Sequence, residues 1–268
     1  MKLDKKRWLI LLCSCLINLC IGSLYAWSVF AGPMSEHLGM ESGQLALVFT
    51  LANAVGPVTM ISGGYINDVM GAKKVIFAGG VLYGAGMIAC SFATGMGLLY
   101  LGYGLGCGLG MGMIYGCTIG NSIKFFPERK GFAGGIATAT YGLSSVILPP
   151  VANRLIENTG VTAAFRIIGI VFLVVICLCS LVMEKCPEGY VPEGYKAVFS
   201  KDGGDNDKNW KQMLKEPAFY IMITVLVCGA FTGLMLISQA SPLAKNMMGF
   251  DAAAAAVIVS VLALFNSI

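Results

Sequence analysis

Several long apolar stretches in this sequence contain aromatic side chains with one polar donor, and four such residues concern us first. Tyr25 and Trp27 share the first stretch, Tyr115 lies in the fourth and Tyr141 in the fifth. Tyrosine and tryptophan each combine an apolar ring with a single O–H or N–H group. Such donors, held in a cavity that excludes water, can bind a carboxylate. Donors of this type are candidates for holding an anion, with core packing or contact with lipid as the alternative for any one aromatic residue.

Acidic side chains are absent from the middle of the apolar stretches. All fourteen Asp and Glu residues lie in polar segments or at the ends of stretches. Ionisable residues inside a membrane usually mark an ion or proton pathway. The pattern argues against a carboxylate proton relay in these residues and favours a pathway for anions. Further uncharged polar residues in the stretches are Asn18, Ser28, Asn53, Thr59, Thr118, Ser144 and Ser145.

The sequence offers no pattern for enzymatic or metal chemistry. Nine of the ten cysteines lie in apolar stretches, none form a C-x-x-C pair, and His37 is the only histidine. Buried cysteine usually behaves as a small apolar residue. The glycine runs around 104–112 lack the preceding strand of a dinucleotide fingerprint. We expect no catalytic residue, no metal and no cofactor, and we disfavour a membrane enzyme or sensor. A net charge of +4 spread over loops also argues against a nucleic-acid partner.

A short polar loop between the second and third stretches reads G-x-x-x-D-x-x-G-x-K-K. Its defining residues are Gly64, Asp68, Gly71, Lys73 and Lys74. The first glycine would let a neighbouring helix approach closely. The carboxylate at a helix end could pair with a base or a helix N-terminus. The second glycine permits a tight turn, and the two lysines hold the loop on the cytoplasmic side.

Eight apolar stretches must position these residues. Of the 268 residues, 57% are hydrophobic and 12% are charged, whereas a soluble domain has about 25% charged residues. A helix that crosses the bilayer needs about 17 to 25 mostly apolar residues, and lipid leaves the backbone no partner but itself. The stretches cover residues 8–30, 44–66, 75–94, 98–122, 131–152, 162–183, 217–238 and 252–268. We therefore predict an all-α membrane protein.

Basic residues are distributed unevenly among the polar segments. With the N-terminus inside, fifteen of the eighteen Lys and Arg residues fall in cytoplasmic segments. The excess of positive charge inside sets topology. We predict a multi-pass protein of the cell (plasma or inner) membrane with a cytoplasmic N-terminus.

The longest polar segment divides the chain. Residues 1–183 are predicted to form a six-helix transmembrane half, and residues 184–216 a cytoplasmic linker. Residues 217–268 would form the incomplete start of a second half, with a seventh and a partial eighth span. Two six-helix halves joined by a linker is a plan of many transporters.

Glycine and proline mark two of the predicted spans. The fourth has glycine at every fourth position from 104 to 120, with a second series at 102, 106 and 110. Such tracks let helices pack backbone to backbone, and a smooth surface could also permit sliding. In the fifth, Pro149 and Pro150 either bend the helix or mark its end.

The loop motif resembles the signature loop of the major facilitator superfamily, and further segments resemble the oxalate:formate antiporter family within it. The segments are 22–30 (GSLYAWSVF), 115–121 (YGCTIGN), 125–131 (FFPERKG), 141–143 (YGL) and 213–220 (MLKEPAFY). The resemblance implies the major facilitator fold, here an N-terminal six-helix bundle plus the first one or two helices of the second half. It also implies a central site in which Tyr25, Tyr115 and Tyr141 match aromatic contacts, with Trp27 next in line.

The resemblance implies a function and leaves an alternative open. It implies a secondary active transporter of small organic anions, of the oxalate/formate or monocarboxylate type, which works by alternating access. Its partners would be a small carboxylate substrate and the lipid bilayer. The family's cationic substrate ligands lie in the eighth and eleventh spans, and the sequence to Ile268 holds only the start of the eighth. The alternative is a truncated, non-transporting fragment, or one part of a split transporter whose C-terminal half is a separate partner.

Overall fold

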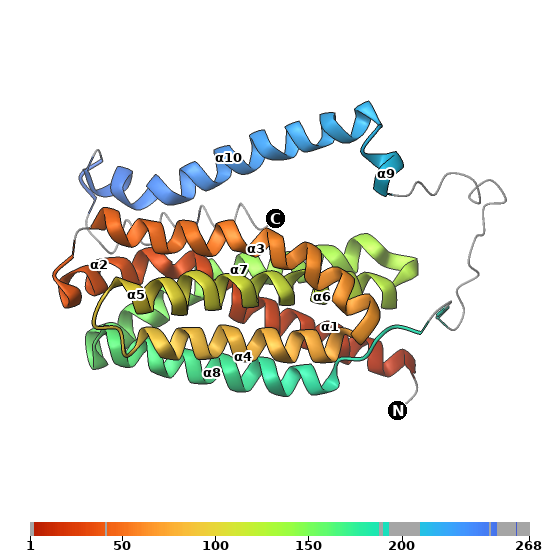
Figure 1. Ribbon diagram of the computed structural model, residues 1–268, viewed down its shortest axis with the longest axis horizontal. Helices are drawn as coiled ribbons and strands as arrows, with labels where there is room; N and C mark the ends of the chain where they lie inside the picture. The colour runs from red at the N-terminus through yellow and green to blue at the C-terminus, as the bar shows by residue number, and fades with distance from the viewer. Residues whose placement is uncertain are drawn as a thin grey trace. The chain divides into compact units, whose positions relative to one another are not determined.

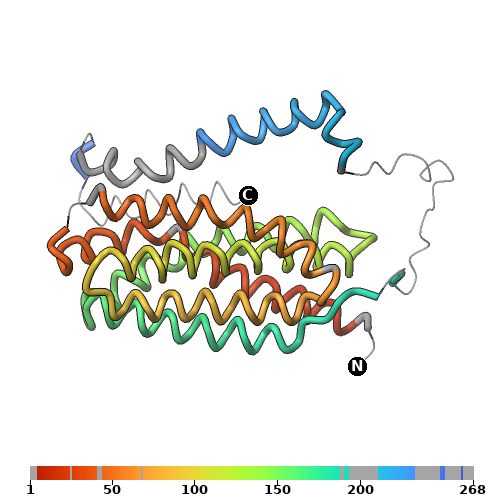
Figure 2. Tube along the Cα trace, in the orientation of Figure 1, coloured from red at the N-terminus to blue at the C-terminus, as the bar shows by residue number. Residues whose placement is uncertain are grey.

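The computed structural model describes residues 3–40, 42–187, 190–192, 210–246, 248–250 and 261. These residues fall into two compact units, one ending at Pro192 and one beginning after it. The described residues are almost entirely helical and contain no strand. Figures 1 and 2 show the long helices of the first unit running side by side. The predicted all-α class is confirmed.

Six helical spans make up the first unit. The first three comprise α1 (Leu3–Ile21), η1 (Gly22–Ala26) and α2 (Trp27–Leu38), then α3 (Ser42–Met70), then α4 (Ala72–Cys90). The fourth comprises α5 (Met96–Leu99), the π-helical η2 (Tyr100–Cys107) and α6 (Gly108–Phe125). The last two comprise η3 (Pro127–Arg129) with α7 (Lys130–Thr159), and α8 (Val161–Val182). Six helices in the described residues are long and apolar enough to cross a membrane, which confirms the first six predicted spans.

Two spans differ in detail from the prediction. The first is not one continuous helix, because a 3-10 segment separates α1 from α2. The fifth continues to Thr159, so Pro149 and Pro150 lie inside α7 and do not end it. Proline is tolerated inside transmembrane helices because side chains and neighbouring helices satisfy the backbone groups that it frees.

The second unit contains α9 (Trp210–Met213) and α10 (Pro217–Asn246). The helix α10 begins where the seventh apolar stretch was predicted to begin. Apart from residue 261, the predicted eighth span lies outside the described residues, as does most of the predicted linker. The division into an N-terminal half, a linker and the start of a second half stays a prediction.

Glycines bring the fourth span against two neighbours at once. A Cβ atom added at Gly108 would lie 2.6 Å from Ala52 O on α3, and Gly112 faces Gly56 O on the same helix. On the other side, a Cβ at Gly110 would lie 2.7 Å from Gly79 O on α4. The predicted backbone-to-backbone packing is confirmed. The series that includes Gly108 and Gly112 packs against α3, and the series that includes Gly110 packs against α4.

Gly64 does not make the close approach that was predicted for it. Among the described residues, nothing lies within 4 Å of a Cβ built there. The preceding Gly63 makes the contact, because a Cβ at that position would lie 3.1 Å from Met113 Cα on α6. One residue along a helix is a rotation of about 100°, so only one of two adjacent glycines can face the neighbour.

Polar segments that are distant in sequence meet at one end of the bundle. Lys6 pairs with Glu184, and Arg7 pairs with Glu128. These ion pairs join the start of α1 to the segment after α8 and to η3. Cys186 Sγ donates to Lys124 O over 3.3 Å, and burial raises the pKa of this thiol, opposed by the charge of Lys124. Three of the segments predicted to be cytoplasmic therefore lie together, although the side of the membrane they face stays a prediction.

Candidate substrate-binding site

The predicted residues Tyr115 and Tyr141 come together where α6 and α7 meet. Their ring centroids are 4.8 Å apart, with the ring planes at 56°. Both rings pack against the buried core and are only partly buried themselves. Offset and tilted ring pairs at this separation attract each other beyond the effect of buried area alone. The two tyrosines therefore form a partly buried aromatic pair where α6 meets α7.

A buried amide joins the helices around this pair. Asn18 on α1 is fully buried, and its Nδ2 donates to Ala137 O on α7 over 3.0 Å. Thr118 Oγ1 on α6 donates to Asn18 Oδ1 over 2.8 Å. The sequence shows both side chains as polar interruptions of apolar stretches, but it does not show that they bond each other.

Trp27 packs against Tyr103 of the fourth span. It begins α2, is 5% exposed, and its ring centroid lies 4.3 Å from that of Tyr103 on η2. The ring of Tyr103 in turn contacts Phe165 of α8 at a centroid distance of 6.4 Å. Trp27 Nε1 has no hydrogen-bond partner among the described residues. The backbone of Tyr25 lies in η1, and its side chain lies outside the described part of the structure.

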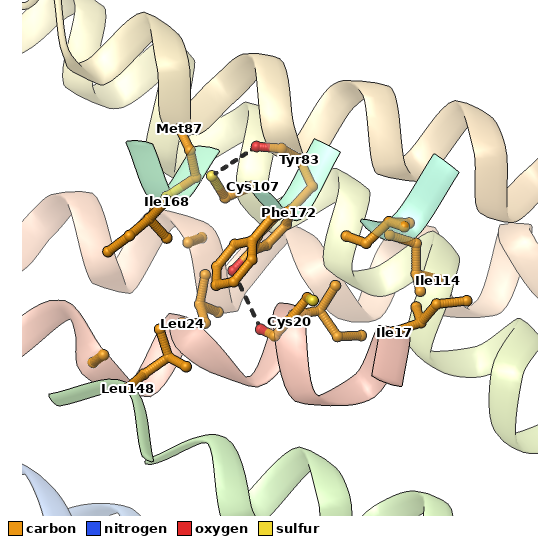
Figure 3. Close-up of a cluster of buried hydrophobic side chains, with 14 of the residues drawn as sticks. Ile17, Cys20, Leu24, Tyr83, Met87, Cys107, Ile114, Leu148, Ile168 and Phe172 are labelled. Carbon is orange, nitrogen blue, oxygen red and sulfur yellow. Dashed lines mark hydrogen bonds between the residues drawn. The ribbon is translucent and has the colours of Figure 1, made fainter. Parts of the chain in front are cut away.

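Two tyrosines that the sequence did not single out hold the 3-10 segment. Tyr83 Oη on α4 donates to Ile21 O over 3.3 Å and shares a 2.7 Å hydrogen bond with Ser23 Oγ. Tyr103 Oη donates to Leu24 O over 3.1 Å. Figure 3 shows Tyr83 beside Cys107 and Phe172 in the buried cluster. A tyrosine hydroxyl deep in an apolar stretch needs a partner, and this was the sequence signal that could have identified both residues.

Gly22 brings η1 directly against α7. A Cβ at this position would collide with Tyr141 O and would lie 2.7 Å from Ser144 Cβ. Glycine is required because no side chain fits between these backbones. The break in the first span is therefore packed against the turn of α7 that carries Tyr141.

The loop motif turns as expected at its second glycine. Gly71 has φ 85° and ψ 151°, and its N–H donates to Asn67 O over 2.9 Å at the end of α3. A positive φ of this kind favours glycine. Lys73 and Lys74 are exposed in the first turn of α4, and the side chain of Asp68 lies outside the described part.

Charge is scarce in the described spans. Arg166 on α8 is exposed, with Nε 3.4 Å from Ser91 Oγ and its guanidinium 4.7 Å from the Phe92 ring centre. It lies near the start of α8, at a helix end. The described residues contain no group of three His, Cys, Asp or Glu side chains that could hold a metal ion. The chemistry available around Tyr115 and Tyr141 is hydrogen bonding by hydroxyl groups and contact with aromatic faces.

The long apolar helices pack closely at glycine residues and are joined by buried hydrogen bonds. These features define a polytopic α-helical membrane protein. The model of the Major Facilitator Superfamily matches residues 8–268, and the chain belongs to this superfamily of transporters. The predicted superfamily is confirmed, and no family of enzymes is indicated.

Three relatives illustrate the similarity. The chain is 28% identical over 263 residues to the Uncharacterized MFS-type transporter YhjX of Escherichia coli (strain K12), covering 98% of this chain and 64% of the relative. It is 28% identical over 261 residues to the Oxalate:formate antiporter of Oxalobacter formigenes, covering 97% and 60%. It is 26% identical over 200 residues to Monocarboxylate transporter 12 of Rattus norvegicus, covering 75% and 40%. The chain thus spans less than two thirds of the length of these relatives.

Proposed function

We propose that this chain belongs to a secondary active transporter that carries small organic anions, of the oxalate/formate or monocarboxylate type, by alternating access. The observation that carries the proposal is the Tyr115–Tyr141 pair, two partly buried phenol rings whose centroids lie 4.8 Å apart. Relatives named for oxalate, formate and monocarboxylates support the same substrate class.

The chemistry of the pair suits a carboxylate. A phenolic O–H donates a short, charge-assisted hydrogen bond to an anionic oxygen, and the bond strengthens where water is excluded. The apolar edge of each ring can cover the carbon atoms of a small organic acid. The spans place no acidic residue at mid-membrane depth that would repel the substrate. The cation that would balance a bound anion is expected, from the family resemblance, in the second half.

The substrate class is tested with the complete gene product in liposomes. The vesicles are loaded with an unlabelled acid and mixed with labelled oxalate, formate or a short monocarboxylate. We expect saturable uptake of label that depends on the internal acid, and no uptake into protein-free vesicles. Absence of exchange for every short carboxylate tried would contradict the proposed substrate class.

A further inference from the structure

One buried side chain bonds to both helices that carry the tyrosine pair. Asn18 lies on α1 and is 0% exposed. Its amide N–H donates to α7 at Ala137 O over 3.0 Å, and its amide oxygen accepts from α6 at Thr118 Oγ1 over 2.8 Å. An amide presents a donor and an acceptor in one rigid plane. Asn18 can therefore bond to α6 and α7 at the same time. A shift of either helix would strain or break its hydrogen bond to Asn18.

Both bonds lie one helical turn from the tyrosines. Ala137 is four residues before Tyr141, and in an α-helix its carbonyl accepts the backbone amide of that tyrosine. Thr118 is three residues after Tyr115, and its hydroxyl oxygen also lies 3.0 Å from Tyr115 O. Residues three and four apart share a helix face. The Asn18 amide is thus bonded to the helical turns of α6 and α7 that carry Tyr115 and Tyr141.

We propose that Asn18 is a positioning residue that fixes the height of α6 against α7 and so sets the geometry of the Tyr115–Tyr141 pair. The physical basis is that a buried polar group left without its partner is costly, whereas the paired group is not. Sliding α6 or α7 by even a fraction of a turn breaks one of the two bonds. The effect on substrate affinity rests on the proposed function, but the effect on ring geometry does not.

Matched substitutions separate this role from general packing. Asn18→Leu removes both bonds with little change in size, and Thr118→Val removes the donor on α6 alone. Thr118→Ser keeps the hydroxyl and serves as the conservative variant. Ser14→Ala is the control, because Ser14 is also fully buried on α1 and bonds Ser122 Oγ of α6 over 3.1 Å, away from the tyrosines.

Ring geometry is read by fluorine NMR of protein labelled with 3-fluorotyrosine, with the two signals assigned by Tyr115→Phe and Tyr141→Phe. We expect both signals to shift in Asn18→Leu and Thr118→Val, and to stay in place in Thr118→Ser and Ser14→Ala. Unchanged signals in a folded Asn18→Leu protein, or equal shifts in Ser14→Ala, would overturn the proposal. If Asn18→Leu does not fold, Thr118→Val decides the question in the same way.

Exchange kinetics test the link to affinity. We expect Asn18→Leu, which removes two interhelical hydrogen bonds, to raise the half-saturating carboxylate concentration by about threefold to tenfold, with a smaller change in maximal rate. A fall in maximal rate alone, with the half-saturating concentration unchanged, would contradict the positioning role. If the unaltered protein exchanges no carboxylate, the proposed function fails, and the fluorine signals still decide whether Asn18 positions the rings.

Discussion

Tyr115 and Tyr141 show how packing brings together two residues that lie far apart in the sequence. Neither tyrosine is unusual in an apolar stretch, and core packing or lipid contact was an open alternative for each. The structure brings their centroids to 4.8 Å and leaves both rings partly accessible. Trp27, by contrast, is 5% exposed and stacks on Tyr103. Its role in substrate binding stays a prediction, and the buried position of its ring makes it a weaker candidate than the pair.

Removing one hydroxyl from the pair should weaken binding without unfolding the protein. For Tyr115→Phe and Tyr141→Phe we expect a rise of about threefold to tenfold in the half-saturating carboxylate concentration, because each loses one hydrogen bond to the anion. The measurement is labelled exchange in liposomes. Tyr65→Phe is the control, since Tyr65 is 75% exposed on α3. An equal effect in all three variants would argue against a special role for the pair.

At the scale of elements, two irregular helices are joined by a buried hydrogen bond from Tyr103 to Leu24 O. The 3-10 segment η1 interrupts the first span, and the π-helical η2 lies between α5 and α6 in the fourth. Both kinds of irregularity recur at functional positions in helices. Here the carbonyls of Ile21 and Leu24 in and beside η1 accept hydrogen bonds from Tyr83 and Tyr103. The break is thus stabilised by side chains of the third and fourth spans.

Loss of a tyrosine hydroxyl should loosen this break. We expect Tyr103→Phe to lower the free energy of unfolding by about 1 kcal/mol, because Leu24 O loses its buried donor. Thermal unfolding in detergent measures the change. Tyr220→Phe provides a comparison, since Tyr220 donates to Leu214 O over 2.8 Å at an exposed position in the second unit. A Tyr103→Phe protein as stable as the unaltered one would show that the bond does not hold η1.

The glycine track gives a graded test along one helix. We expect Gly112→Ala to destabilise the protein, because its new methyl group would strike Gly56 O and Thr59 Oγ1 on α3. Gly120→Ala should be neutral or stabilising, since nothing among the described residues lies within 4 Å of that position and alanine favours helix by about 1 kcal/mol. The thermal unfolding temperature and the expression level of the Gly112→Ala and Gly120→Ala proteins measure this difference. Equal behaviour of both variants would contradict the packing that we describe.

At the scale of the whole molecule, charge and apolar surface are separated along the bundle. The start of α1, the segment around η3 and the segment after α8 are joined by two ion pairs at one end. Exposed apolar side chains cover much of the bundle surface, including Val58, Ile61 and Val69 on α3. This arrangement suits a protein surrounded by lipid, and the cytoplasmic location of its basic segments stays a prediction.

Reporter fusions test that orientation. A reporter that is active only outside the cytoplasm should be inactive when fused after Lys130 and active when fused after Asn158. A cytoplasmic fluorescent reporter at the same two positions should give the opposite pattern. Activity of the external reporter after Lys130 would reverse the predicted topology.

The sequence by itself determined the helical class, the first six spans and the turn at Gly71. Apolar length, the lack of backbone partners in lipid and the φ preference of glycine are local properties that can be read along a chain. The glycine tracks were visible for the same reason, because their spacing follows the helical period.

Only the tertiary structure decided which residues meet across helices. It assigned the close approach to Gly63 in place of Gly64, paired Tyr115 with Tyr141, and joined Asn18 to both α6 and α7. It also showed that Tyr83 and Tyr103 stabilise a break that the hydropathy pattern does not reveal. These outcomes depend on the rotation and height of each helix against its neighbours. A change of one residue rotates the contact face by about 100° while leaving the apolar pattern nearly unchanged.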